Sequence, residues 1–217
     1  MKNKVMIKKF KINTRMTLIT GLHIGAGSDN VEIGGIDRIV LRRAIDNIPY
    51  IPGSSLKGKI RSLLEQIAGA AEIGGSESVN KLFGTASDNV HIPSKLIVRD
   101  SYMSNESNDV LAKSEFTDMP FTEIKFENSI SRVEGKATNP RQTERIPAGT
   151  SFDVEFIINV WDNEEDGEKS FELLKKGIAA LENDYLGGSG SRGYGQVRFG
   201  QLEKEEISFE NYFTDEG

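Results

Sequence analysis

The stretch SFDVEFIINVW, residues 151–161, decides the fold of this chain. Its large apolar side chains occupy every second position, namely Phe152, Val154, Phe156, Ile158 and Val160. Because successive side chains of a β-strand point to opposite faces, this strict alternation predicts a strand with one buried face. The elements on either side can be assigned outward from it.

Two helices are predicted, one before this strand and one after it. Residues 54–68 carry one apolar stripe at helical spacing, made by Leu56, Ile60, Leu63, Leu64 and Ile67. Residues 168–185 carry a second stripe, made by Phe171, Leu174, Ile178 and Leu181. In the first helix, Ser54 or Ser55 can cap the start. Gly58 suggests close packing against that helix, because an interior glycine costs about 1 kcal/mol relative to alanine.

Further strands complete the pattern. Residues 5–20 alternate apolar and polar side chains, 94–102 and 196–199 are shorter strands, and 207–213 is a candidate for another. Apart from insertions, the order is strand, helix, strand, strand, helix, strand, which predicts an α+β fold of the ferredoxin-like βαββαβ type. RNA-recognition domains share this arrangement, but so do proteins of many functions, so the fold alone assigns none.

Three stretches interrupt this order. Residues 69–92 are small and polar apart from Leu82 and Phe83, and we interpret them as an insertion. Residues 103–120 look like a loop. Residues 121–150 are rich in charged and amide side chains, which is more typical of a projecting hairpin than of core.

Composition limits the class of protein. The 217 residues suit a single domain with insertions. No apolar run approaches the roughly 20 residues that span a bilayer, and the N-terminus lacks the apolar segment of a secretory signal, so no membrane partner is expected. There is no cysteine, hence no disulfide and no thiolate metal site. The cytoplasm is the default location.

The net charge of −6 argues at first against nucleic acid, but the charges are unevenly placed. Basic residues dominate the stretches 2–15 and 38–61, whereas acids concentrate at 162–172 and 203–216. Two interpretations stay open. The chain can present a basic groove on an acidic body, or it has two solvated faces of opposite sign.

Two nucleotide-binding motifs fail on inspection. GSSLKGKI (53–60) has the Walker A spacing, but Ile60 stands where Ser or Thr should hold Mg²⁺. GxGxxG occurs from Gly188 to Gly193. A dinucleotide fingerprint runs from strand through glycines to helix, whereas here a helix precedes the glycines and a strand follows.

The two glycine-rich loops can still bind an anion, since glycine lets backbone N–H groups approach a ligand closely. GLHIGAG (21–27) follows one strand and GGSGSRGYG (187–195) precedes another, so a ferredoxin-like topology can bring them together. We expect phosphate contacts there, with two surface turns as the alternative. The candidate residues are His23, Gly25, Gly27, Gly188, Gly190, Ser191, Arg192 and Gly193. His23 is expected to touch RNA rather than to lie in the core.

The first helix offers a second group of candidates. Lys57 and Arg61 share one face, with Lys59 on a flank, close to the helix start at Ser54 and Ser55. Backbone N–H groups at a helix start favour anions, so these residues are candidates for phosphate contacts. A solvated face is the alternative.

Catalytic side chains are few. His23 and His91 are the only histidines, so a two-histidine ribonuclease would need this one pair. Asp37 follows two glycines and precedes basic residues. A carboxylate in that setting can orient a ribose 2′-OH or hold a hydrated Mg²⁺ near a phosphate. Alternatively, Asp37 caps a turn or pairs with Arg38 or Arg42.

Seven motifs occur together in one order and spacing: GLHIGAG, IGGID, PYIPGSSLKGKIRSLLE, KLFG, TEIKFENSISR, NPRQTERIPAGTSF and ENDYLGGSGSRGYGQVRF. In this combination they resemble the repeating backbone subunit of the type III-A CRISPR–Cas (Csm) effector complex, in the RAMP superfamily. The resemblance runs from Leu22 to Phe199, nearly the whole chain.

The resemblance implies a modified RNA-recognition fold with a lid-like insertion, here 69–92, and a protruding thumb hairpin, here 121–150. It also implies head-to-tail copies along a CRISPR RNA, other subunits of the complex, and cleavage of complementary target RNA with Mg²⁺ or another divalent cation. Asp37 matches the catalytic aspartate, which we also expect to hold the metal. The thumb would contribute the RNA-binding cations Lys125, Arg132, Arg141 and Arg145.

One departure from the family pattern is visible. The catalytic aspartate of the family is often followed, after one residue, by proline, whereas Arg38 and Ile39 follow here. The strand 151–161 also lacks an aromatic-rich segment, so binding is expected at phosphate and ribose rather than by base stacking on the sheet.

Two alternatives stay open: an RNA-binding scaffold that does not cut, and an interaction protein that binds no RNA.

Overall fold

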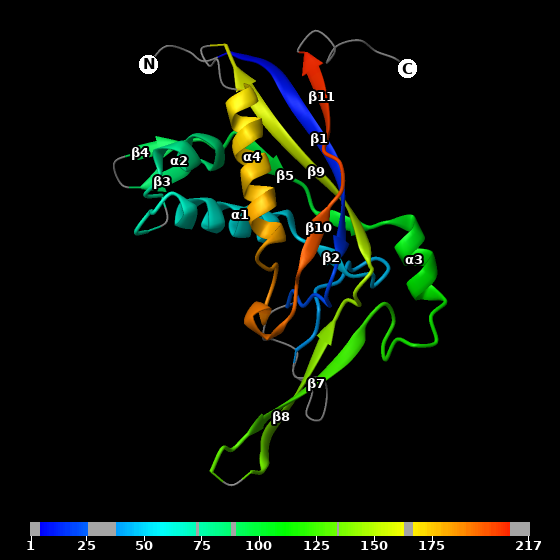
Figure 1. The fold of residues 1–217 in the computed structure, drawn as a ribbon. Helices are drawn as coiled ribbons and strands as arrows, with labels where there is room; N and C mark the ends of the chain where they lie inside the picture. The colour runs from blue at the N-terminus through cyan, green and yellow to red at the C-terminus, as the bar shows by residue number, and fades with distance from the viewer. Residues whose placement is uncertain are drawn as a thin grey trace.

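The computed structural model describes residues 5–25, 38–72, 74–87, 90–133, 135–162 and 167–208, and in this part of the chain seven strands form one sheet. Two long helices, α1 (Gly53–Ile67) and α4 (Gly167–Glu182), pack against each other beside the sheet, while a hairpin projects from the body (Figure 1). None of the described helices is long and apolar enough to cross a membrane. The fold is mixed α+β, as predicted.

The main path of the sheet follows the order β10-β1-β9-β6-β2, with antiparallel neighbours. These strands are β1 (Met6–Leu18), β2 (Tyr50–Ile51), β6 (Ser101–Met103), β9 (Ser151–Trp161) and β10 (Val197–Phe199). β5 (Leu96–Val98) also pairs with β9, and β11 (Glu203–Ser208) pairs with β1 at the edge. Along the chain the core runs β1, α1, β5–β6, β9, α4, β10, which is the predicted ferredoxin-like connectivity.

The β1–β9 pair forms the centre of the sheet. Phe10 lies opposite Ile158 and Ile12 lies opposite Phe156, and all four side chains are buried. Lys11 and Ile157, the positions between them, lie opposite each other on the other face and are only partly buried. The alternation of side chains therefore gives the sheet one apolar face, which the two helices cover.

The two helices approach each other at a glycine of α4. A Cβ atom on Gly177 would lie 2.4 Å from Cγ2 of Ile60 and 3.0 Å from Cδ1 of Leu64, so no larger residue fits without a shift. Gly58, by contrast, is exposed, and a Cβ there would meet none of the described atoms within 4 Å. The expectation of close packing at Gly58 is wrong, because this residue lies on the side of α1 opposite its buried stripe.

Helix α1 begins without the predicted serine cap. It starts at Gly53 after Pro52, and neither Ser54 nor Ser55 provides a capping hydrogen bond. Instead, the N–H of Gly53 donates to the Asp100 carboxylate at 2.8 Å. The expectation failed because a residue distant in sequence satisfies the free N–H group at the helix start.

Two stretches differ from the sequence interpretation. The strand expected at 94–102 is two short strands, β5 and β6, which both pair with β9. The stretch 103–120, expected to be a loop, contains α3 (Asn105–Ala112), with the Ser104 side chain accepting from the N–H of Ser107 at 3.3 Å. Helix α3 has no buried residue, so its sequence lacks the apolar stripe that reveals a helix.

The stretch 69–92 contains secondary structure of its own, namely α2 (Glu77–Phe83) and a small hairpin of β3 (Thr85–Ser87) and β4 (Val90–Ile92). Val79, Leu82 and Phe83 are buried. The short apolar part of this stretch therefore packs onto the core beside α1, while most of its other described residues remain partly or fully exposed.

The projecting hairpin consists of β7 (Glu123–Ile130) and β8 (Ala137–Arg145), which form a separate two-stranded sheet (Figure 1). Its base is buried at Thr122, Thr143 and Glu144, whereas Phe126 and Ile130 further along are exposed. Two strands alone are marginally stable in water, so the direction of this hairpin depends on the contacts at its base.

Replacing Gly177 by Ala should lower the free energy of unfolding by about 1–3 kcal/mol, because the new methyl group must displace Ile60 or Leu64. Gly58→Ala is the matched control on the neighbouring helix. It should raise stability by about 0.5–1 kcal/mol, since alanine is the better helix former and its methyl group meets open space. Urea unfolding of the isolated chain measures both changes, and equal effects would contradict a tight helix contact at Gly177.

Candidate functional site

The two glycine-rich loops lie side by side, which confirms the expectation from the topology. The N–H of Gly188 donates to the carbonyl oxygen of His23 at 2.9 Å, and the N–H of Gly195 donates to that of Gly21 at 3.0 Å. A Cβ on Gly187 would lie 2.3 Å from the carbonyl oxygen of His23, so this approach requires glycine. The two backbones therefore form one joint surface.

The predicted loop residues sit differently on that surface. Gly25, Gly188, Ser191, Arg192 and Gly193 are exposed, and Gly190 is half-buried. A Cβ on Gly190 would overlap the Tyr185 ring, so the ring lies flat against the loop backbone. Gly27 lies outside the described residues.

The base of the hairpin joins the first loop from the other side. Leu22 and Ile146 exchange two backbone hydrogen bonds, of 2.9 and 2.8 Å. Nδ1 of His23 lies 2.7 Å from the carbonyl oxygen of Glu144. Three segments that are distant in sequence thus meet at the point where the hairpin leaves the core.

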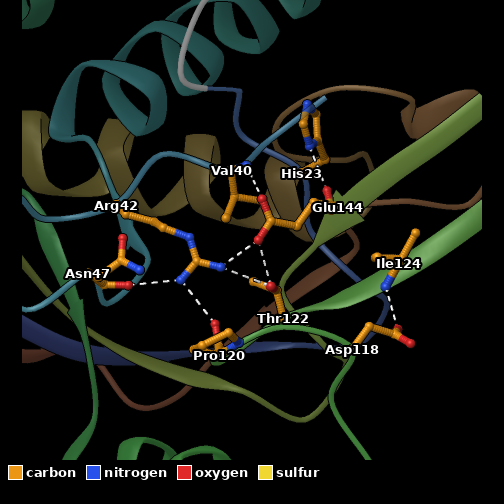
Figure 2. A network of polar contacts seen from close by, with 9 residues as sticks. All are labelled: His23, Val40, Arg42, Asn47, Asp118, Pro120, Thr122, Ile124 and Glu144. Carbon is orange, nitrogen blue, oxygen red and sulfur yellow. Dashed lines mark hydrogen bonds and ion pairs between the residues drawn. The ribbon is translucent and has the colours of Figure 1, made fainter. Parts of the chain in front are cut away.

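The Glu144 carboxylate is the centre of a polar network at this point (Figure 2). Its side chain is 1% exposed. It accepts hydrogen bonds from the N–H of Val40 at 2.7 Å, the Thr122 hydroxyl at 2.6 Å and the Arg42 guanidinium at 2.5 Å. Arg42 also donates to the carbonyl oxygens of Asn47 and Pro120. A buried carboxylate is tolerated only when other groups donate hydrogen bonds to it. The two oxygens of Glu144 accept from the neighbouring segments that carry Val40, Arg42 and Thr122.

Strand β8, which carries Glu144, also binds the residues that follow Asp37 in the sequence. The N–H of Glu144 donates to the carbonyl oxygen of Arg38 at 3.0 Å. The N–H of Leu41 donates to the carbonyl oxygen of Ile24 at 2.9 Å. The backbone from Arg38 onward is therefore bound both to the hairpin and to the first glycine-rich loop. Asp37 itself lies outside the described residues.

His23 is buried, with 7% of its surface exposed, so the expectation that it lies outside the core is wrong. The loop that carries it is enclosed by the hairpin base and the second glycine-rich loop. Because a carbonyl oxygen can only accept, Nδ1 carries the proton in the bond to Glu144. Burial lowers the pKa of His23, and the nearby Arg38 guanidinium adds to this effect. The ring is thereby favoured in its neutral form.

The three helix cations have partners within the chain. Lys57 donates to Ser94 Oγ at 2.7 Å and to the carbonyl oxygen of Leu96 at 2.8 Å. Burial, together with the neighbouring Arg61, lowers the pKa of Lys57. These bonds tie α1 to the strand that follows the insertion, so the interpretation of a purely solvated face is wrong for Lys57.

Arg61 and Lys59 complete this arrangement. Arg61 donates to Glu65 at 2.9 Å and to Asn80 of α2 at 3.1 Å, which fixes the insertion to α1. The ammonium group of Lys59 lies 3.3 Å from the Asp184 carboxylate and 3.8 Å from the centre of the Tyr185 ring. Of the two serines at the helix start, Ser54 is exposed and Ser55 is half-buried.

The four hairpin cations fall into two pairs. Arg132 and Arg141 are exposed. Lys125 and Arg145, near the base, lie over the ring of Tyr194 from the second glycine-rich loop. The sequence interpretation missed Tyr194 and Glu144. The only sequence signal for Glu144 is a single acid among the cations of β8.

A metal site with several protein ligands is not present among the described residues, which contain no group of three or more His, Asp or Glu side chains placed to hold an ion. Mg²⁺ often uses only one or two carboxylates together with water and phosphate oxygens. Asp37, the predicted metal ligand, lies outside the described residues.

Comparison with known proteins identifies the class. The family model of the RAMP superfamily matches residues 15–198, a range that includes the central strand β9, both long helices and the hairpin. This chain belongs to the RAMP superfamily.

Within the superfamily, the relatives that match most of its length are Csm3 proteins. The chain is 43% identical over 211 residues to the "CRISPR system Cms endoribonuclease Csm3" of Streptococcus thermophilus, covering 94% of this chain and 92% of the relative. A protein of the same name from Enterococcus italicus is 42% identical over 201 residues, covering 89% and 91%. A chain in the crystal structure of a Csm3–Csm4 subcomplex of the type III-A CRISPR–Cas interference complex superposes with a TM-score of 0.63 at 29% identity, covering 98% of this chain and 86% of that one.

Glu144→Ala should destabilise the chain by about 3–5 kcal/mol, because it leaves the Arg42 charge and two further donors without their buried acceptor. Glu172→Ala is the matched control, since its pair with Lys175 is exposed and should contribute less than about 1 kcal/mol. Chemical denaturation of the isolated chain measures both. A loss at Glu144 no larger than that at Glu172 would remove it from the centre of the network.

Stability should also depend on the protonation of His23. Its folded-state pKa lies below the ordinary value of 6.5, so the unfolded chain binds the proton more readily and stability falls as the pH drops through 6.5. His23→Gln should make the free energy of unfolding depend less steeply on pH as the pH falls from 7 through 6.5. His91→Gln, at an exposed histidine, is the control and should leave the slope as in the wild type. The check is urea unfolding across this pH range, and parallel curves for all three proteins would rule out a buried neutral His23.

Proposed function

We propose that this chain binds a CRISPR RNA and cuts complementary target RNA with the carboxylate of Asp37. The activity class follows from its relatives: the Csm3 proteins are endoribonucleases of the type III-A CRISPR effector, and this chain is an endoribonuclease subunit of the same kind. A single structural observation supports Asp37 as the catalytic carboxylate. The backbone that begins directly after Asp37 is bound to the hairpin base through Glu144 and to the first glycine-rich loop through Ile24.

The RNA surface in this proposal runs along the hairpin and the glycine-rich loops. It uses the exposed cations Arg132 and Arg141, with Ser191, Arg192 and the backbone of the loops. These groups suit phosphate and ribose rather than base edges. A protein whose sequence specificity comes from a guide RNA needs this kind of contact, since it must accept any guide.

The family resemblance extends the proposal to assembly. Residues 69–92 would act as the lid and 121–150 as the thumb, within a single domain comprising residues 1–217. Copies would stack head to tail along the CRISPR RNA in the cytoplasm, together with other subunits of the type III-A complex. The solved relative described as a Csm3–Csm4 subcomplex supports such contacts with another subunit. Each thumb would displace a target nucleotide and so set the interval between cuts.

The proposed reaction is a transfer within the target RNA. The 2′-oxygen of the nucleotide beside the displaced one attacks its own adjacent phosphorus while the bond to the next 5′-oxygen breaks, leaving a 2′,3′-cyclic phosphate and a 5′-OH. The Asp37 carboxylate orients the 2′-OH. The proton of this hydroxyl group passes to a base or to water, and the departing 5′-oxygen takes a proton from water. A divalent cation such as Mg²⁺, held by Asp37, would supply charge stabilisation at the phosphate oxygens.

Asp37→Ala in the assembled complex should reduce target cleavage by roughly 100-fold or more while guide and target binding persist, because only the reacting carboxylate is removed. Asp109→Ala, at an exposed aspartate of α3, is the control and should cut like the wild type. Gel analysis of labelled target with Mg²⁺ measures cleavage, and filter binding measures affinity. Undiminished cleavage by the Asp37 variant would make this chain a scaffold and place the nuclease elsewhere.

A target with a single 2′-deoxy nucleotide at the cut site tests the chemistry separately. The proposed reaction has no nucleophile there, so that cut should disappear while the neighbouring cuts remain. Cleavage at the deoxy position would mean that water, not the 2′-oxygen, attacks the phosphorus.

A further inference from the structure

The hairpin and the second glycine-rich loop meet at one aromatic ring. Tyr194 is 1% exposed. The ammonium group of Lys125, on β7, lies 4.3 Å from the ring centre, and the guanidinium carbon of Arg145, on β8, lies 5.2 Å from it. Both strands of the hairpin therefore place a cation on the same ring, and each cation is attracted to the electron-rich ring face.

Carboxylates hold the two cations in this position. The ammonium group of Lys125 lies 3.2 Å from Glu127, and Arg145 donates to Glu123 at 2.5 Å. Arg192 of the loop approaches the same Glu127 carboxylate at 3.9 Å. Attraction between loop and hairpin is thus carried by one charge pair, Arg192 with Glu127, as well as by the ring.

The loop that carries Tyr194 is itself firmly attached to the core. Its hydrogen bonds to Gly21 and His23 were described above, and Gly195 has a φ of +71°. A Cβ on Gly195 would lie 1.9 Å from the carbonyl oxygen of Leu186, so the chain reverses tightly beside the tyrosine. The ring is consequently presented from a fixed support, whereas the hairpin is two strands that need an attachment.

We propose that Tyr194 is a positioning residue whose ring, clamped by Lys125 and Arg145, fixes the angle at which the hairpin leaves the core. We call these three residues the latch. The inference rests on the proposed function, in which the hairpin is the thumb that displaces a target nucleotide. It also reassigns Lys125 and Arg145, which were expected from the sequence to bind RNA, to holding the hairpin.

The first test measures the hairpin without RNA. The chain has no native cysteine, so spin labels can be placed at Arg132→Cys on the hairpin and Lys175→Cys on the exposed side of α4. In the full-length chain, Tyr194→Leu should roughly double the width of the distance distribution, because an aliphatic side chain gives the cations no ring face. Tyr194→Phe keeps the ring and should retain the wild-type distribution.

Two further variants keep this test decisive. Tyr102→Leu removes a different tyrosine that also lies under a cation, Arg43, but on β6 between β9 and β2, and should leave the distribution unchanged. Lys125→Met keeps the apolar stem and loses the charge, so it should broaden the distribution even if Tyr194→Leu does not fold. A narrow distribution in Lys125→Met and in any folded Tyr194→Leu protein overturns the latch.

The second test links the latch to cleavage in the assembled complex. Tyr194→Leu should lower target cleavage by roughly 10- to 100-fold through misplacement of the displaced nucleotide, and Tyr194→Phe should restore it. Equal losses for Leu and Phe would assign the effect to the hydroxyl group and overturn the role of the ring. Since the distance measurement uses no RNA, failure of the wild-type complex to cut would reject the proposed function while leaving the latch to be judged by the first test.

Discussion

The buried carboxylate of Glu144 is the interaction on which the rest of this structure depends. A two-stranded hairpin cannot hold its own direction in water, and a buried charge cannot remain without partners. Glu144 contributes to meeting both constraints at the base of the hairpin. By bonding Val40, Arg42 and Thr122, Glu144 fixes the hairpin to the chain that follows Asp37, and its carbonyl oxygen fixes His23 as well. The attachment of the hairpin to the segment after Asp37 therefore depends on one satisfied charge.

The sequence predicts the frame of this protein well, because the frame depends on local periodicity. The alternation in 151–161 identifies β9, and the two apolar stripes identify α1 and α4 to within a few residues. The contact between the two glycine-rich loops also follows, since the ferredoxin-like connectivity leaves few other arrangements. The assignment of Asp37 is different in kind: its local setting leaves a catalytic and a structural role open, the family resemblance favours the catalytic one, and the assignment stays a prediction.

What the sequence does not predict are features created by contacts between distant segments. Gly177 and Gly58 are both helix glycines, and only the packing of α1 on α4 distinguishes them. Helix α3 buries no residue, so it has no periodic signal. His23 lies in a loop whose composition is typical of a surface, yet two other segments enclose it. The helix cations look solvated until the insertion and α4 are placed against them.

The edge strand β11 has a consequence for how such a chain can associate with others. An uncovered sheet edge offers free backbone groups to any neighbouring strand, and it can lead to uncontrolled aggregation. Here the edge beside β1 is closed by a strand whose outward residues, Glu203 to Glu206, are charged and exposed. Charged side chains along an edge strand disfavour its pairing with a strand of another chain. The closed edge is thereby protected against unselective pairing with strands of other chains.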